Sequence, residues 1–482
     1  MVFSNLIFIY IFLPLNLLLC ALIRETKYKN ICMLVFSLAF YAWSSPKYLV
    51  LLILMAFINY IAASKIQAFA DRWESKVILI ADLAITLGLL GYFKYFGFLC
   101  SMIDSVVNIF DVIPNVVLPV GISFYTFQLI SYVTDVYRKD VEADKSFVNV
   151  LLYASLFHQC IAGPIVRYKD IAKELKQRSA GIDQVSDGIS RFCVGLAKKV
   201  ILADTCNDIL KTLLPDTITA GANLTVAAAW VGCIIYMLQI YLDFSAYSDM
   251  AIGLGKMTGL HYKENFNYPY LSKSVTEFWR RWHMSLSTFF RDYVYIPLGG
   301  NRKGLARQLV NMLVVWALTG LWHGAGYSFV LWGLYYFVFL VLEKVFLLKI
   351  FKKLPHIIAT FVSRVYTLLV VCIGWILFRF GDTDTIIYII KAMFGANGNE
   401  FINFEASTII LNNIVFVMIC IFAATPITKI ISRRINKLMN TASINAIWVY
   451  NVINIVIPVV LLFLSTISLI GDSYNPFIYF RF

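Results

Sequence analysis

Charged residues are scarce in this chain. Of its 482 residues, 14% are Asp, Glu, Lys or Arg, whereas about a quarter would be charged in a soluble domain. Hydrophobic residues make up 60% and the mean hydropathy is +0.75. No stretch is long and polar enough to form a separate soluble domain, and no internal repeat of the kind that builds many transporters is evident. We therefore expect one membrane-embedded domain over residues 1–482.

Several signatures of enzymes and exported proteins are also missing. The chain contains no His-Glu-x-x-His zinc motif, no Gly-x-Ser-x-Gly nucleophile elbow and no Walker loop. Its nine cysteines are scattered singly through apolar runs, so we expect small core residues, with no metal site. The first apolar stretch lacks a basic n-region and a small-residue cleavage site, which favours a retained first helix over a signal peptide.

Apolar stretches of about 20 residues recur along the whole chain, and each is long enough to cross a bilayer core of about 30 Å. Within lipid every backbone amide must be bonded inside its own segment, which favours helices. The sequence thus predicts an all-α polytopic integral membrane protein. The expected spans are 5–22, 30–46, 48–64, 77–93, 117–137, 147–163, 224–244, 308–323, 325–343, 357–377, 408–425 and 446–470.

Basic residues give a formal net charge of +13, but they gather between the spans. This placement is typical of cytoplasmic loops rather than of nucleic-acid binding, and no nucleic-acid partner is expected. The N-terminus and the tail 471–482 then face outward, and the amphipathic segment 167–178 is expected along the cytoplasmic surface. The residues that define the cytoplasmic loops are Arg24, Lys27, Lys29, Lys65, Arg72, Lys76, Lys429, Arg433, Arg434 and Lys437.

The span pattern breaks down between about 185 and 300. Charged residues such as Lys199 and Asp243 interrupt the apolar runs, and 278–287 mixes aromatic residues, two arginines and a histidine. Such groups occur at membrane depth only where they are buried in protein or line a water-filled cavity. We therefore expect a polar core inside the membrane over about 185–330, built partly from broken or re-entrant helices.

The five histidines differ in their surroundings. His356 and His261 lie in polar interhelical segments and are expected to have no special role. His158 lies near the end of an expected span, where a hydrogen-bonded core histidine is favoured over a cavity-lining group. His323 lies at the expected bend of a helical hairpin within 308–342, one helical turn after Thr319. An ionisable group at that depth is a candidate functional residue, with a buried histidine hydrogen-bonded to a backbone carbonyl as the alternative.

His283 is the second candidate. At helical spacing it would share a face with Trp279 and Ser287, and Arg280 is also one turn away. A neutral imidazole can take a proton from a hydroxyl at physiological pH. Arg280 and its neighbour Arg281 suit an anionic ligand, such as the phosphates of a nucleotide-based donor. A packing role for His283, with the arginines as cytoplasmic anchors, remains the alternative.

Six blocks, in order, resemble the membrane-bound O-acyltransferase family, and specifically its bacterial branch of alginate O-acetyltransferase-like proteins. With the first residues and the tail, the resemblance covers almost the whole chain. The blocks are 118–128 (LPVGISFYTFQ) running into 135–138 (DVYR), 161–167 (IAGPIVR), 241–253 (YLDFSAYSDMAIG), 276–287 (TEFWRRWHMSLS), 291–301 (RDYVYIPLGGN) and 320–325 (GLWHGA).

The resemblance implies a ring of about 11–12 transmembrane helices around a central tunnel. Acetyl-coenzyme A or another acyl thioester would be the donor substrate, with no bound cofactor. By motif, His323 matches the family's central catalytic histidine and His283 its second one; His323 would be the general base while His283 orients donor or intermediate, an assignment the sequence leaves open. The residues expected along the tunnel or donor site are Arg280, Arg281, Trp279, Ser287, Asp243 and Gln128.

The last residues resemble the aromatic C-terminal motif of this branch, in which a tyrosine is proposed to carry the acyl group onward. Tyr479 is therefore expected to be an acyl relay on the outer side, with an aromatic interface anchor as the alternative. The resemblance further implies a bacterial cell membrane, an extracytoplasmic hydrolase-like partner of the SGNH type, and O-acetylation of alginate, another exopolysaccharide or peptidoglycan.

Two other functions remain open at this point. In a transporter or channel, Asp135, Asp243, Asp249 and the histidines would line a permeation path. In a D-alanyl transferase the same fold would use a carrier-protein thioester, although the blocks 296–301 and 323–326 resemble the acetyltransferase branch more closely. The ordered motifs favour the acetyltransferase.

Overall fold

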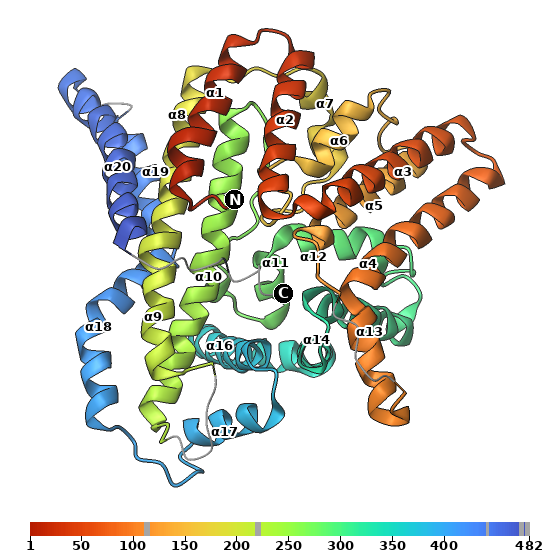
Figure 1. The fold of residues 1–482 in the computed structure, drawn as a ribbon. Helices are drawn as coiled ribbons and strands as arrows, with labels where there is room; N and C mark the ends of the chain where they lie inside the picture. Colours follow the sequence, from red (N-terminus) through yellow and green to blue (C-terminus); the bar gives the residue numbers. More distant parts are fainter. Residues whose placement is uncertain (110–115, 217–222, 440–442, 472–476, 478–482) are drawn as a thin grey trace. The chain divides into compact units, whose positions relative to one another are not determined.

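The computed structural model describes residues 1–109, 116–216, 223–439, 443–471 and 477. These residues form α-helices joined by short π and 3-10 segments, and no strand occurs among them (Figure 1). The predicted all-α class is confirmed. The chain divides into two compact units: unit 1 is Met1–Phe192, Tyr247–Glu264 and Thr288–Pro297, and unit 2 is Cys193–Ala246, Asn265–Ser287 and Leu298–Phe482.

Unit 1 is built mainly from the first third of the chain. In it, α3 packs against α4 and α5, and α2 packs against α6. Its elements are η1 (Phe8–Phe12), α1 (Leu13–Leu22), α2 (Thr26–Ser44), η2 (Pro46–Tyr48), α3 (Leu49–Ala68), α4 (Trp73–Val107), α5 (Ile122–Tyr137), α6 (Phe147–Ser155), α7 (Tyr168–Lys176), most of α8 (Ile182–Ala197), the last turns of α10 (Val226–Met257), the end of α12 (Met284–Phe290) and η5 (Arg291–Tyr295).

Unit 2 holds most of the expected polar core and the last part of the chain. Besides the remaining residues of α8, α10 and α12, it contains η3 (Lys198–Ala203), α9 (Asp204–Leu213), η4 (Pro269–Leu271), α11 (Val275–Arg281), α13 (Gly304–His323), α14 (Tyr327–Leu342), η6 (Glu343–Leu347), α15 (Leu348–Phe351), α16 (His356–Arg379), α17 (Thr383–Met393), α18 (Phe404–Ala423), α19 (Ile427–Met439) and α20 (Ile444–Gly471). In this unit α14 packs against both α13 and α16.

Seven helices in the described part of the chain are long and apolar enough to cross a membrane. They make this a multi-pass membrane protein, as expected, although fewer helices meet this criterion than the twelve predicted spans. The seven are Pro46–Ala68, Trp73–Val107, Val226–Met257, Gly304–His323, His356–Arg379, Phe404–Ala423 and Ile444–Gly471.

The other five expected spans are helices that are shorter or more polar. The clearest differences are at 147–163, where α6 has 9 residues, and at 117–137, where α5 has 16 residues that are nearly all buried. Apolar runs of this kind pack inside the protein rather than against lipid, so they need not span a full bilayer thickness. Hydropathy alone does not separate buried from lipid-facing helices.

Candidate active site

His323 is the last residue of α13, at the bend of the predicted helical hairpin, which the structure confirms. The two helices approach closely where each presents a glycine to the other's backbone. A Cβ on Gly320 would overlap the carbonyl of Phe329, and one on Gly333 would overlap the carbonyl of Trp316. Thr319, one turn before His323, donates its hydroxyl hydrogen to the carbonyl of Val315 at 2.7 Å. The glycine pair therefore determines how near α14 comes to the histidine.

Aromatic rings surround the His323 imidazole, which is 4% exposed. The ring centroids of Trp322 and Trp332 both lie 4.9 Å from that of His323, and Phe378 from α16 lies at 5.1 Å. All three contacts are edge-on. This apolar surrounding excludes water from the ring, which strengthens any electrostatic interaction that it makes with a reacting group.

His283 lies in a break between α11 and α12. Its φ is 44°, a left-handed conformation that is rare for a residue other than glycine. The predicted common helical face of Trp279, His283 and Ser287 is therefore wrong, because α11 ends at Arg281 and α12 starts at Met284. The expectation of a broken helix in this segment is confirmed. Ser287 still contacts Trp279 across the break, since its hydroxyl donates to the Trp279 carbonyl at 3.0 Å.

The imidazole of His283 is held by a buried asparagine. Nδ1 of His283 lies 3.2 Å from Oδ1 of Asn265, and Ser285 contacts the same oxygen through its backbone N–H at 3.2 Å and its hydroxyl at 2.9 Å. Asn265 is 1% exposed. Burial lowers the pKa of the His283 imidazole to about 3, so the ring is neutral at physiological pH. Sequence reasoning missed Asn265, because a lone asparagine in a loop carries no signal of its own.

Both histidines lie close to one indole ring, that of Trp322. The ring centroid of Trp322 lies 5.8 Å from that of His283 and 4.9 Å from that of His323. Both histidines belong to unit 2, although 40 residues separate them in sequence. Phe244 from α10 packs edge-on against His283 at 4.7 Å, and Phe477 lies 5.8 Å from Phe244. The structure thus brings together the two residues that the sequence singled out.

A buried glutamate holds α11, the helix that leads to His283. The Glu343 carboxylate accepts from the backbone N–H groups of Val275 and Thr276 at 2.5 and 2.9 Å, and from the Thr276 hydroxyl at 2.7 Å. Free N–H groups at a helix start favour such an anion. Ser274 adds an N-cap by accepting from the Glu277 N–H. Glu343 could have been noticed in the sequence as a lone acid directly after an apolar stretch.

The predicted donor-binding residues divide into buried and exposed ones. Trp279 is buried among Trp316, Trp332 and Tyr336. Arg280 is exposed, whereas Arg281 is half-buried and pairs with Glu277 at 2.6 Å. Because α11 ends at Arg281, Arg280 and Arg281 do not share a helix face with His283.

Asp243 takes part in a buried ion-pair cluster. Lys199 lies 2.8 Å from a carboxylate oxygen of both Asp243 and Asp204, and its side chain is 6% exposed. Burial by itself lowers the pKa of Lys199, but the two carboxylates raise it above its usual value. One buried cation thus lies between two carboxylates, so these charges of the expected polar core contact one another within unit 2. In unit 1, Asp249 pairs similarly with Arg191 at 2.9 Å, and Asp135 with Lys169 at 3.2 Å.

The other residues that the sequence singled out are Gln128, Tyr479 and three more histidines. Gln128 is fully buried in α5 of unit 1, and Tyr479 lies outside the described residues. His158 is a buried histidine whose Nδ1 is 3.0 Å from the Tyr262 hydroxyl, which confirms the favoured interpretation. His261 is exposed and lies 2.6 Å from Glu174, and His356 is exposed at the start of α16.

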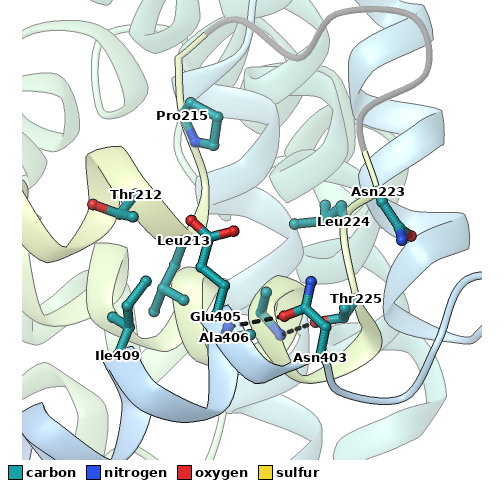
Figure 2. A pocket seen from close by; sticks show the side chains of 11 residues that line it. Thr212, Leu213, Pro215, Asn223, Leu224, Thr225, Asn403, Glu405, Ala406 and Ile409 are labelled. Atoms are coloured by element: carbon teal, nitrogen blue, oxygen red, sulfur yellow. Dashed lines mark hydrogen bonds between the residues drawn. The ribbon is translucent and has the colours of Figure 1, made fainter.

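A cavity of about 160 Å³ is present in another part of unit 2. It lies where the end of α9 and the starts of α10 and α18 meet, and Figure 2 shows Asn223, Asn403 and Glu405 around it. Asn403 caps α18 by accepting from the Ala406 N–H at 2.8 Å. None of the predicted site residues lines this cavity.

Membrane-spanning helices and two buried imidazoles in a dry aromatic setting define a membrane-embedded protein equipped for proton-transfer chemistry. The profile of the membrane-bound O-acyltransferase family matches residues 140–380, which include both histidines. The chain is 36% identical to the probable alginate O-acetylase AlgI of Pseudomonas putida over the full length of both proteins. It is 29% identical to the peptidoglycan O-acetyltransferase of Helicobacter pylori over 86% of each chain.

The chain is also 30% identical to the teichoic acid D-alanyltransferase of Bacillus subtilis, but this match covers only 55% of this chain and 69% of that protein. From the profile match and the full-length similarity, this chain belongs to the membrane-bound O-acyltransferase family, in the branch that resembles alginate O-acetyltransferases. The resemblance inferred from the six sequence blocks is confirmed, and the protein is an O-acyltransferase enzyme.

Proposed function

We propose that the chain moves an acetyl group from a cytoplasmic coenzyme A thioester to a hydroxyl group of an extracytoplasmic polysaccharide or cell-wall polymer. The observation that carries the proposal is the pair of buried histidines, His283 and His323, which both contact the Trp322 indole. The relatives named as alginate O-acetylase and peptidoglycan O-acetyltransferase support an acetyl group and a polymer acceptor.

The proposed chemistry needs a proton acceptor and little else, because a thioester is already activated. Nε2 or Nδ1 of His323 takes the hydroxyl proton while the hydroxyl oxygen forms a bond to the acyl carbon. The carbon–sulfur bond then breaks, and the imidazolium returns the proton to the thiolate, which leaves as the free thiol. His283 orients the donor or the intermediate. General base help typically contributes about 10²–10⁴-fold, and positioning adds to it.

Arg280 and Arg281 are the proposed contacts for the donor's phosphates. Arg280 is exposed and carries its charge into solvent, where it can attract an anionic nucleotide. Asp243, Trp279, Ser287 and Gln128 remain proposed tunnel residues. No resident cofactor is part of this proposal, since acetyl-coenzyme A is consumed as a substrate.

The proposed setting is the bacterial cytoplasmic membrane, with both termini on the outer side. The chain shows no resemblance to a sugar-binding domain, so a hydrolase-like partner of the SGNH type outside the membrane would complete transfer to the polymer. In this scheme the Tyr479 hydroxyl is the first acceptor, and the partner receives the acetyl group from the tyrosine ester.

His323→Ala tests the catalytic assignment. Membranes containing the protein, its partner and acceptor polymer are incubated with acetyl-coenzyme A labelled in the acetyl group, and polymer-bound label is counted. We expect a loss of about 10²-fold or more, because the substitution removes the proposed general base. His356→Ala, at an exposed histidine, serves as the matched control and should retain full transfer. Unchanged transfer by His323→Ala would show that the assignment is wrong.

Tyr479→Phe tests the relay. The substitution keeps the ring but removes the oxygen that would carry the ester, so acetylation of the polymer should be abolished. Labelled ester on the protein itself, detected after denaturation and released by mild base, should disappear in the same variant. Normal polymer acetylation by Tyr479→Phe would leave the tyrosine as an interface anchor.

D-alanyl transfer is the second candidate, favoured only by the match to teichoic acid D-alanyltransferases. Because these matches cover less of the chain, D-alanyl transfer is the weaker candidate function. Supplying a labelled D-alanyl carrier-protein thioester in place of acetyl-coenzyme A separates the two. The membership of an acyltransferase family argues against a transporter or channel.

A further inference from the structure

We infer that Asn265 is a positioning residue that holds His283 in the tautomer with its hydrogen on Nδ1, leaving Nε2 as the nitrogen that accepts hydrogen bonds. The inference rests on the proposed function, in which His283 takes part in acyl transfer. It adds a residue to the site, and it states which nitrogen of His283 carries the hydrogen and which one can accept a hydrogen bond.

The first step is the orientation of the Asn265 amide. A backbone N–H can only donate, and the Ser285 N–H points at the atom assigned as Oδ1 of Asn265 at 3.2 Å. The Ser285 hydroxyl approaches the same atom at 2.9 Å. If the amide were flipped, its NH₂ group would face an N–H donor. The atom must therefore be the oxygen, which accepts and cannot donate.

The second step transfers this constraint to the imidazole. Nδ1 of His283 lies 3.2 Å from the same oxygen. Since the oxygen can only accept, Nδ1 must carry the hydrogen; in the other tautomer two lone pairs would face each other inside the protein. The Ser285 hydroxyl oxygen, 3.3 Å from Nδ1, can share this hydrogen. A neutral ring with its hydrogen on Nδ1 has a lone pair on Nε2.

The third step concerns the backbone, which keeps Asn265 against the break in the helix. The Met284 N–H donates to the Asn265 carbonyl at 2.9 Å, and the Asn267 N–H donates to the Arg281 carbonyl at 2.9 Å. The loop 265–267 thus satisfies backbone groups that the break would otherwise leave open. A left-handed histidine costs free energy and persists only where its surroundings enforce it. The left-handed backbone of His283, the loop 265–267 and the tautomer of the ring therefore depend on one another.

The consequence is a defined role for His283. With its lone pair on Nε2 it binds substrate as an acceptor, from a hydroxyl or an amide N–H. It does not donate a hydrogen bond from Nε2 to a carbonyl oxygen or an oxyanion. Substrate groups that bear hydrogen, rather than the acyl oxygen, are therefore the partners of His283.

The test compares Asn265→Leu with Asn265→Asp. Leucine has a similar shape and no acceptor, whereas aspartate keeps an oxygen that accepts from Ser285 and from Nδ1. Loss of the partner that orients a metal-bound histidine typically costs about 10–100-fold, and Asn265 would orient the His283 ring in the same manner. We expect kcat/KM for acetyl transfer to fall by about that factor in Asn265→Leu and to be largely restored in Asn265→Asp. Asn267→Leu, an exposed asparagine whose bond to Arg281 runs through the backbone, is the matched control and should match the unchanged protein.

A spectroscopic readout separates the tautomer from mere stability. In protein labelled with ¹⁵N-histidine, the His283 resonances are those missing from His283→Ala, and the two nitrogens give distinct shifts when protonated and when bare. We expect hydrogen on Nδ1 in the unchanged protein and in Asn265→Asp. Hydrogen on Nε2 in the unchanged protein would overturn the inference, even if Asn265→Leu failed to fold.

Kinetics distinguish the two possible failures. If His283→Ala retained full transfer, the proposed role of His283 would be wrong, whatever the tautomer. If His283→Ala abolished transfer while a folded Asn265→Leu was fully active, His283 would keep its role and Asn265 would lose the one inferred here.

Discussion

At the scale of single residues, burial and partnership decide what an unusual side chain does. The sequence predicts Lys199 and Asp243 as charges of a polar core, and the structure pairs both, together with Asp204, in one buried cluster. His158 and His323 both occur in apolar surroundings. His158 is hydrogen-bonded to a tyrosine, whereas His323 lies among aromatic rings beside Trp322. The sequence shows the type of each residue and its neighbours along the chain. Which distant residues each side chain contacts is decided by the folded structure.

Lys199→Met should destabilise the protein strongly. It leaves the carboxylates of Asp204 and Asp243 buried without their cation, and breaking such a pair typically costs about 3–5 kcal/mol. The midpoint of thermal unfolding in detergent should drop accordingly. Lys211→Met is the control, because Lys211 and Asp208 are half-exposed and such surface pairs contribute about 0–1 kcal/mol. Equal midpoints for the two variants would contradict this account of the cluster.

At the scale of elements, two features position the histidines. The hairpin α13–α14 was predicted from an uncharged stretch with glycines near its bend, and it is present. The break at His283 within 278–287 was expected, but not its left-handed backbone or the loop that pairs with it. Helical periodicity assumes a continuous helix, so it assigned Trp279, His283 and Ser287 to a shared face that does not exist.

Gly333→Ala should disturb the hairpin. The added Cβ would overlap the Trp316 carbonyl, so α13 and α14 must move apart. Overpacking of this kind costs about 1–3 kcal/mol, and acetyl transfer should fall with it because His323 ends α13. In Gly88→Ala, the matched control within α4, the new Cβ meets no described atom within 4 Å apart from its chain neighbours and the backbone of its own helix. Stability and transfer are measured on both; a harmless Gly333→Ala would mean that the helices tolerate wider spacing.

At the scale of the whole molecule, the need to cross a membrane explains the length and hydrophobicity of the main helices. Seven described helices are long and apolar enough to span it, and the short helices α5 and α6 pack inside unit 1 instead. The helix α19 carries Lys429, Arg433, Arg434 and Lys437 without an acidic residue, and it follows the span α18 directly. The positive-inside rule predicts that α19 is cytoplasmic and that the chain before α18 is outside.

Cysteine labelling tests this topology. The native cysteines are first replaced. Ala396→Cys then places one exposed thiol before α18, and Asn436→Cys places one exposed thiol in α19. A membrane-impermeant maleimide added to intact cells should label Ala396→Cys, and it should label Asn436→Cys only after the membrane is opened. The opposite pattern would invert the orientation and move the tail containing Tyr479 to the cytoplasmic side, where the proposed relay could not work.

The sequence by itself determined the membrane class, the helical fold, the family and the two candidate histidines. These follow from local quantities: the length of apolar runs sets what can cross a bilayer, and blocks of residues identify relatives. Only the tertiary structure decided that both histidines contact Trp322, that Glu343 caps α11, and that Asn265 holds His283. Hydrogen bonds and ring contacts join residues distant in sequence, and their geometry depends on how helices break and pack, which composition and periodicity do not encode.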